Sequence, residues 1–194
     1  MNYNSFFPTI IGSVQNTDNE KISEELIPHC VQISQTVQSG GKGWLSSKTY
    51  NTSDGRYDLS KDHKFFKINN WIETQIKLYC SELDIETNTL VSTGSWFNIY
   101  NKNDFQEPHV HPNSSISAIY ILTCPEDGAR IFFYSPINNM YYVKKQVNKQ
   151  EMIDHIICTS LPGTLLIFPS YLTHAVENHN SDKLRLSFSY NYKN

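Results

Sequence analysis

The stretches Glu107-Pro108-His109-Val110-His111-Pro112 and Phe168-Pro169-Ser170-Tyr171-Leu172-Thr173-His174 decide how this chain is expected to fold. Alternate residues of an extended strand project to the same side, so His109 and His111 share one face. The apolar run before Pro169 predicts a later strand, and the turn after it delivers His174 to that face. Three imidazoles that meet in this way suit iron, nickel, copper or zinc. The sequence therefore predicts a three-histidine metal site on a β-scaffold.

Arg185 follows His174 by eleven residues, in a strand that alternates apolar and polar side chains. One row faces a helical layer and the other faces the interior of a barrel. The first row is Leu184, Leu186, Phe188 and Tyr190, and the second is Arg185, Ser187 and Ser189. A buried charge without its partner costs on the order of 3–5 kcal/mol. The interior beside the metal is therefore expected to be hydrated or to hold a carboxylate bound by Arg185 and Ser187.

A second alternating run, Trp96-Phe97-Asn98-Ile99-Tyr100, precedes the first histidine pair. Trp96, Asn98 and Tyr100 share one face of this expected strand. Asn98 and Tyr100 can donate hydrogen bonds into the same cavity as the metal and Arg185. The alternative is purely structural, with Asn98 as a satisfied core amide and Tyr100 at the rim.

The bulk composition narrows the class of protein. The chain has 194 residues, a formal net charge of -3 and a pI near 6.1, which fit one domain and disfavour nucleic acid as a partner. The four cysteines form no C-x-x-C pair and are expected to be free thiols. We expect a cytoplasmic, soluble protein, because neither a signal peptide nor a membrane span is apparent. The oligomeric state cannot be read from the sequence.

Two amphipathic helices precede a region of short strands. Apolar residues at helical spacing predict helices from about residue 18 to 37 and from 65 to 83, with a polar loop from 41 to 62 between them. From residue 86 onward the spacing of apolar residues changes towards a period of two, which is typical of strands. Strands are expected at Leu90–Tyr100, Ser115–Thr123, Arg130–Tyr134, Met140–Val147, Thr164–Phe168, His174–Glu177 and Leu184–Tyr190.

This order predicts an α+β fold that is mainly β, with an antiparallel barrel or jelly roll. We expect a single domain over residues 1–194, with helical support over about 1–85 packed on one sheet of a core over about 86–194. Four other histidines are expected to be surface or capping residues: His29, His63, His155 and His179. Asp104 and Glu107 could reach a metal only if the loop before His109 folded back, and are not expected to do so.

The ordered set of motifs resembles the superfamily of iron(II)- and 2-oxoglutarate-dependent oxygenases, specifically a group found in marine bacteria and tailed phages. The resemblance covers nearly the whole chain. It rests on Phe7-Pro8-Thr9, Gly43-Trp44, Trp96-x-Asn98, His109-x-His111-Pro112-x-Ser114, Ser117-x-x-Tyr120, Phe168-Pro169-Ser170-x-x-x-His174 and Arg185-x-Ser187.

The resemblance implies a double-stranded β-helix, a cupin-like jelly roll, with iron(II) at His109, His111 and His174. It also implies that Arg185 grips the distal carboxylate of 2-oxoglutarate, and by position Tyr100 and Tyr120 look like the tyrosines that help to hold it. The chain would then be a dioxygenase that couples decarboxylation of 2-oxoglutarate by O2 to hydroxylation of a small molecule or peptide.

One position departs from the superfamily pattern. The usual motif is H-x-D or H-x-E, whereas this chain has His111 in place of the carboxylate. A neutral imidazole there leaves more positive charge on the metal and can change metal preference or oxygen activation. The substitution affects the expected catalysis rather than the expected fold.

Two other functions fit part of the pattern. A cupin-type metal enzyme without 2-oxoglutarate would use the three histidines, but would leave Arg185 without an obvious role. A non-catalytic binding or structural module would keep the barrel, with or without a metal. The substrate cannot be read, and its specificity is expected to come from the loops at 40–62, 101–108 and 138–150.

Overall fold

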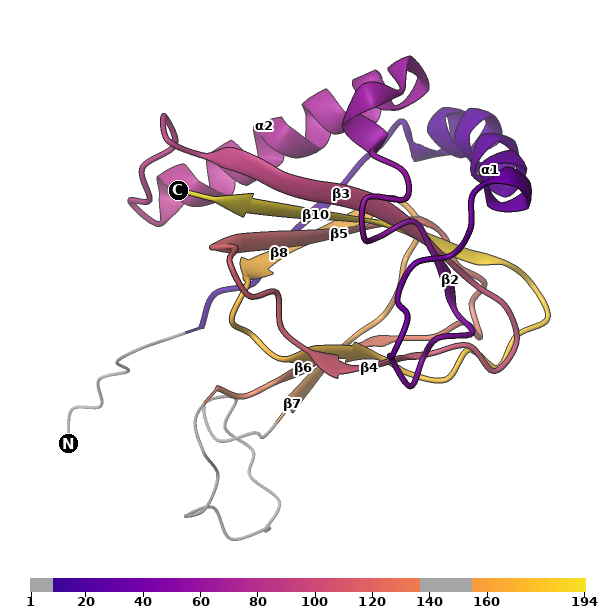
Figure 1. Cartoon of the computed structure of the whole chain (residues 1–194). Coiled ribbons are helices and arrows are strands. Elements are labelled where there is room, and N and C mark those ends of the chain that lie inside the picture. Colours follow the sequence, from indigo (N-terminus) through magenta and orange to yellow (C-terminus); the bar gives the residue numbers. More distant parts are fainter. Residues whose placement is uncertain (1–8, 137–154) are drawn as a thin grey trace, which may run out of the picture.

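Two antiparallel sheets face each other in the computed structural model, which describes residues 9–136 and 155–194 (Figure 1). The major sheet has the order β1-β8-β5-β10-β3-β2, and the minor sheet has the order β4-β9-β6-β7. The major strands are β1 Gly12–Gln15, β8 Thr164–Pro169, β5 Ile116–Thr123, β10 Arg185–Lys193, β3 Val91–Tyr100 and β2 Tyr50–Asn51. The minor strands are β4 Gln106–His109, β9 His174–Val176, β6 Ile131–Tyr134 and β7 His155–Cys158. The predicted double-stranded β-helix is confirmed.

Two helices cover the outer face of the major sheet (Figure 1), as predicted. Helix α1 spans Asn19–Thr36 and α2 spans Phe66–Glu82, and two short 3-10 turns, η1 Leu59–Lys61 and η2 His63–Phe65, lead into α2. Each helix turns one apolar face to the sheet. The buried residues on these faces are Ile22, Leu26, Cys30 and Ile33 in α1, and Ile68, Ile72, Ile76, Tyr79 and Cys80 in α2. None of the helices in the described residues is long and apolar enough to cross a membrane.

The alternation predicted for the last strand holds in β10. Leu186, Phe188 and Tyr190 belong to the core between the major sheet and the helices. Arg185 and Ser187 point to the other side, where they line a cavity between the sheets. The backbone of β10 therefore separates a helix-facing apolar layer from a polar interior.

Four short strands were not predicted. They are β1, β4 and β7, each of four residues, and the two-residue β2, which lies in the stretch expected to be a loop. Strand β4 has the sequence Gln-Glu-Pro-His, in which too few residues are apolar to show a period of two. Only its pairing with β9 in the folded protein identifies it as a strand. The predicted strand at Met140–Val147 lies outside the described residues. The prediction of free cysteines is confirmed for all four residues.

Asp62 joins the two helices at a partly buried position. Its carboxylate accepts hydrogen bonds from His29 Nε2 at 2.5 Å, from the Tyr57 hydroxyl at 2.5 Å and from the Lys64 backbone N–H at 3.0 Å. Burial alone would raise the pKa of Asp62, but these donors outweigh burial and lower the pKa from 3.8 to about 2. The carboxylate therefore stabilises the folded state in its ionised form.

We expect Asp62→Asn to lower the free energy of unfolding by on the order of 2 kcal/mol at pH 7, because hydrogen bonds to a charged group are lost. The folded-state pKa lies below the unfolded one, so this contribution is complete above pH 4 and declines as pH falls towards 2. Urea unfolding of both proteins at pH 7 and pH 3 measures the difference. Asp127→Asn, at an exposed turn position, is the control. A difference that grew at pH 3 would contradict the role of the ionised carboxylate.

Candidate metal centre and anion pocket

Three histidines converge at one end of the minor sheet. His109 at the end of β4 is the register partner of His174 at the start of β9, which places their side chains side by side. His111 follows β4, where its backbone N–H donates to the Ser170 carbonyl at 3.0 Å. Ligand atoms of the three residues all lie within 4.8 Å of one another, and Nε2 of His111 lies 3.2 Å from Nε2 of His174. This is a group of donors that one ion can bridge.

Backbone carbonyls orient two of the three rings. Nδ1 of His109 donates to the Glu107 carbonyl at 2.8 Å, and Nδ1 of His174 donates to the Leu172 carbonyl at 3.0 Å. A carbonyl oxygen can only accept, so each Nδ1 carries the proton and each Nε2 keeps its lone pair. This arrangement is typical of metal-ligating histidines, whose second nitrogen is held by a hydrogen bond.

The electrostatics of the cluster favour neutral imidazoles. Burial lowers the pKa of His109, and burial together with the neighbouring His109 lowers that of His111 to about 4. Burial and repulsion by the other two rings keep the pKa of His174 well below 6.5. Three uncharged rings at neutral pH need not lose a positive charge before they bind a metal, and this donor set fits iron(II) or a similar divalent ion.

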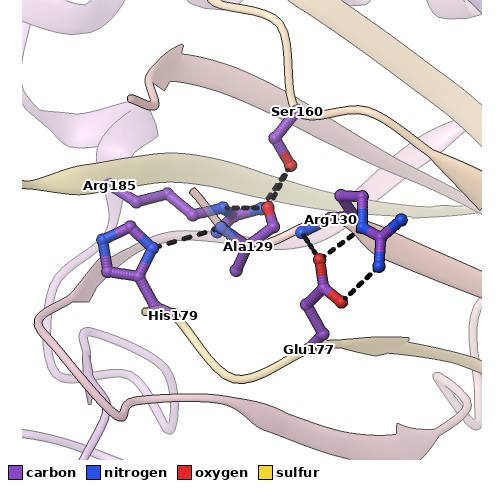
Figure 2. A network of polar contacts seen from close by, with 6 residues as sticks. All are labelled: Ala129, Arg130, Ser160, Glu177, His179 and Arg185. Carbon is purple, nitrogen blue, oxygen red and sulfur yellow. Dashed lines mark hydrogen bonds and ion pairs between the residues drawn. The ribbon is translucent and has the colours of Figure 1, made fainter. Parts of the chain in front are cut away.

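Arg185 is fully buried and faces the cavity from the start of β10. Its Nε donates to the Ala129 carbonyl at 3.2 Å, and its terminal nitrogens make long contacts of 3.4 and 3.5 Å with the hydroxyls of Ser160 and Ser187 (Figure 2 shows the Ala129 bond). The Tyr100 ring covers the guanidinium, with 4.4 Å from Cζ to the ring centroid. Within residues 9–136 and 155–194, no carboxylate forms an ion pair with Arg185.

The polar neighbours of Arg185 carry no negative charge. Its terminal nitrogens make only long contacts with the hydroxyls of Ser160 and Ser187, and Tyr100 and Cys124 are its other side-chain hydrogen-bond neighbours. The planar guanidinium can match the two oxygens of a carboxylate, and a buried cation needs such a partner.

A rigid network behind Arg185 fixes its position (Figure 2). Nδ1 of His179 accepts the Ala129 backbone N–H at 3.2 Å, and the Ser160 hydroxyl donates to the Ala129 carbonyl at 2.6 Å. The exposed pair Arg130–Glu177 ties the next residue to the end of β9, with contacts of 2.6 and 2.9 Å. Sequence reasoning missed the roles of Ala129, Ser160 and His179, because no local pattern marks a residue that acts through a backbone carbonyl.

One cavity of about 560 Å³ contains both the three imidazoles and Arg185. Asn98, Tyr100 and Ser187 line it, as expected from strand parity. Nδ2 of Asn98 donates to the Ser189 hydroxyl at 3.1 Å. Aromatic rings frame the metal-binding side, with Trp44 against His109 at 5.1 Å and Trp96 against His111 at 5.7 Å between ring centroids. The cavity is therefore polar at Arg185 and walled by rings at the histidines.

Tyr120 corrects one expectation. Its ring lies in the core on the helix side of the major sheet, and its hydroxyl donates to Asn19 Oδ1 at 2.7 Å. In the ladder Tyr120 pairs with Phe188, which also faces the helices, so strand alternation turns both away from the cavity. Tyr120 therefore cannot hold 2-oxoglutarate in this fold, and the inward residues of β5 beside it are Ile119 and Ile121.

The remaining histidines and carboxylates lie elsewhere. These histidines were expected to be surface or capping residues. His63 is exposed, whereas His29 is partly buried against Asp62 and His179 is fully buried, so neither of these two is a surface residue. His155 begins β7 and stacks on Phe132. The carboxylates of Glu107 and Asp104 accept hydrogen bonds from backbone N–H groups. Glu107 accepts from Leu45 and Ser46, and Asp104 accepts from Asn101.

The predicted specificity loops differ in their placement. The loop from 40 to 62 forms much of the cavity wall, whereas the loop from 101 to 108 contributes only Gln106 among the lining residues that the structure describes. The loop at 138–150 lies outside the described residues.

The fold and the site together define a double-stranded β-helix protein with a buried histidine cluster and an anion pocket in one cavity. A family model described as "Putative 2OG-Fe(II) oxygenase" matches residues 94–191, just over half of the chain. The chain therefore belongs to the 2OG-Fe(II) oxygenase family. No protein with a curated description matches the sequence.

Solved structures with this fold include several 2-oxoglutarate enzymes. A prolyl-4-hydroxylase from Pseudomonas putida aligns with a TM-score of 0.62 at 12% identity, over 95% of this chain and 92% of that one. HygX from Streptomyces hygroscopicus, solved with nickel, 2-oxoglutarate and hygromycin B bound, aligns with a TM-score of 0.62 at 12% identity, over 95% of this chain and 83% of that one. The alpha-ketoglutarate-dependent carbocyclase SnoK from nogalamycin biosynthesis aligns with a TM-score of 0.65 at 10% identity, over 95% of this chain and 79% of that one. At these identities the likeness shows the shared fold.

Proposed function

We propose that His109, His111 and His174 hold iron(II), and that Arg185 holds the distal carboxylate of 2-oxoglutarate in the same cavity. The observation that carries this proposal is the fully buried Arg185, which has no carboxylate partner among the described residues and faces the cavity of three neutral imidazoles. Together these groups supply one metal site and one carboxylate site, as this co-substrate requires.

Iron(II), when bound, supplies the redox chemistry that couples decarboxylation of 2-oxoglutarate by O2 to oxidation of a substrate C–H bond. The chain's own residues bind and orient the reactants. Arg185 fixes one end of the co-substrate, because the N–H groups of a guanidinium form a rigid, planar fork. Tyr100 covers the face of this fork, and Ser187 and Asn98 add polar groups beside it.

His111 changes the charge balance of the site. Three neutral imidazoles leave the full charge of a divalent ion uncompensated, and Arg185 adds a further positive charge in the same cavity. A dianion such as 2-oxoglutarate offsets the metal at one end and Arg185 at the other. The absence of a ligand carboxylate therefore makes binding of the co-substrate more favourable on electrostatic grounds.

The primary substrate is a small molecule or a peptide that enters between the rings and the loop at 40–62. Relatives of the same fold offer both kinds: HygX was solved with hygromycin B, and a Trichoplax adhaerens prolyl hydroxylase was solved with a peptide fragment. We also propose that the chain acts as a single cytoplasmic domain. Its origin in a marine bacterium or tailed phage stays a prediction from the resemblance.

Succinate formation tests the proposal. Incubation of the wild-type chain with iron(II), 2-oxoglutarate and O2, without a primary substrate, is expected to give slow, enzyme-dependent succinate production. Omission of iron or of O2 should stop it. If the complete mixture gave no succinate and the metal-loaded protein bound no 2-oxoglutarate, a cupin-type enzyme or a non-catalytic module would replace this proposal.

A further inference from the structure

Three polar side chains, buried Ser117 and Ser170 and partly buried Asn191, form a chain of hydrogen bonds that ends on Nδ1 of His111. Nδ2 of Asn191 donates to His111 Nδ1 at 3.1 Å, and Oδ1 of Asn191 accepts from the Ser117 hydroxyl at 2.8 Å. The hydroxyls of Ser117 and Ser170 lie 2.8 Å apart, and both side chains are buried. None of the three residues belongs to the cavity wall. We call Asn191, Ser117 and Ser170 the Asn–Ser relay.

The direction of each bond in the relay determines where the His111 proton lies. An amide nitrogen only donates, so His111 Nδ1 must be the acceptor and its proton must lie on Nε2. That Nε2 lies 3.2 Å from Nε2 of His174, which keeps a lone pair and can accept it. His111 is therefore in the opposite tautomer from His109 and His174, and this tautomer cannot offer Nε2 to a metal.

The relay also has a second arrangement in which every bond is made. If the Asn191 carboxamide rotates by half a turn, Oδ1 accepts from Nδ1–H of His111, and Nδ2 donates to the Ser117 oxygen. Ser117 can then donate to Ser170, because either hydroxyl can be the donor of that pair. In this change Nε2 of His111 gives its proton to water, and Nδ1 of His111 takes a proton from water. The ring stays neutral, and its Nε2 lone pair becomes free.

We propose that Asn191, supported by Ser117 and Ser170, is a positioning residue that sets the tautomer of His111, and that rotation of its carboxamide frees Nε2 of His111 for the metal. This inference rests on the proposed metal site. The other two histidines are held by carbonyls, which accept in both states, so His111 alone among the three has a partner that can reverse its role. The switch lies at the position where the superfamily pattern has a carboxylate ligand.

Two substitutions of similar size move zinc affinity in opposite directions. Asn191→Asp leaves only acceptors beside His111, which favours the proton on Nδ1 and adds negative charge behind the ligand. We expect zinc binding to tighten by at least about tenfold, since such outer partners change metal affinity by about 10–100-fold. Asn191→Leu removes the hydrogen bond while it keeps the volume, and should weaken binding by at least about tenfold.

Competition with a chromogenic chelator measures zinc affinity, and the melting temperature of the metal-free proteins reports folding. Asn180→Asp adds the same charge in an exposed turn before β10, whose start lies about 20 Å from Asn191 by strand geometry, and should bind zinc like the wild type. Two-bond nitrogen–proton NMR should show His111 protonated on Nε2 without zinc and on Nδ1 with zinc.

The outcomes separate the two proposals. If the wild type bound no zinc, the assignment of the metal site would be wrong, and the inference about the Asn–Ser relay would fail with it. If the wild type bound zinc but the Asp and Leu variants matched it, or both weakened binding with lowered melting temperatures, the relay would be only structural. An unchanged His111 tautomer on zinc binding would also overturn the switch.

Discussion

His174→Ala is expected to abolish stoichiometric metal binding, from one iron(II) per chain to none. His174 is the most deeply buried of the three ligands and lies beside both others, so its loss leaves two donors and a void at the centre of the site. Two imidazoles without a third ligand or a carboxylate do not define the facial set that iron(II) requires. Metal content after anaerobic loading and gel filtration measures the change.

His63→Ala is the matched control, because His63 is exposed at the start of η2 and lies outside the cluster. Its metal content should equal that of the wild type. Unchanged metal in the His174 variant would contradict the three-histidine assignment. A melting temperature close to that of the metal-free wild type would show that the variant is folded.

Arg185→Lys should weaken 2-oxoglutarate binding by at least about tenfold while metal affinity stays nearly unchanged. Lysine keeps the charge but replaces the planar fork by a single ammonium, which cannot pair with both oxygens of a carboxylate at once. It also loses the bond from Nε to the Ala129 carbonyl and the stacking on Tyr100. Each charge-assisted hydrogen bond is worth about 1.5–3 kcal/mol, so the loss of one is enough for a tenfold effect.

Anaerobic calorimetric titration of 2-oxoglutarate into the metal-loaded proteins measures this difference. Arg130→Lys is the control, since Arg130 makes an exposed ion pair with Glu177 near the same network and does not line the cavity. Exposed ion pairs contribute little, so the 2-oxoglutarate affinity of this variant should match that of the wild type. Equal affinity in the Arg185 variant and the wild type would remove Arg185 from the co-substrate site.

The sequence predicts the residues of this site where strand alternation is local. Arg185, Ser187, Asn98 and Tyr100 face the cavity because a period of two is visible in their own strands. Strand β5 is buried on both faces, so its own sequence does not show which side Tyr120 takes. The pairing of Tyr120 with Phe188 in the ladder with β10 turns it towards the helices.

Other features depend on pairing between distant strands and have no local signal. The register of β10 against β5 places Asn191 opposite Ser117, and thereby builds the Asn–Ser relay. Buried His179 acts on Arg185 through the backbone of Ala129, which no spacing in the sequence reveals. Strand β4 has little apolar periodicity, and its ladder with β9 brings His109 to His174.

A crystal structure of the wild-type chain, grown anaerobically with iron(II) and 2-oxoglutarate and measured at the iron absorption edge, tests the central claim most directly. We expect one anomalous peak in contact with Nε2 of His109, His111 and His174, and the distal carboxylate of 2-oxoglutarate paired with Arg185. An iron peak away from the three imidazoles, or a co-substrate carboxylate that leaves Arg185 without an anion, would contradict the assignment.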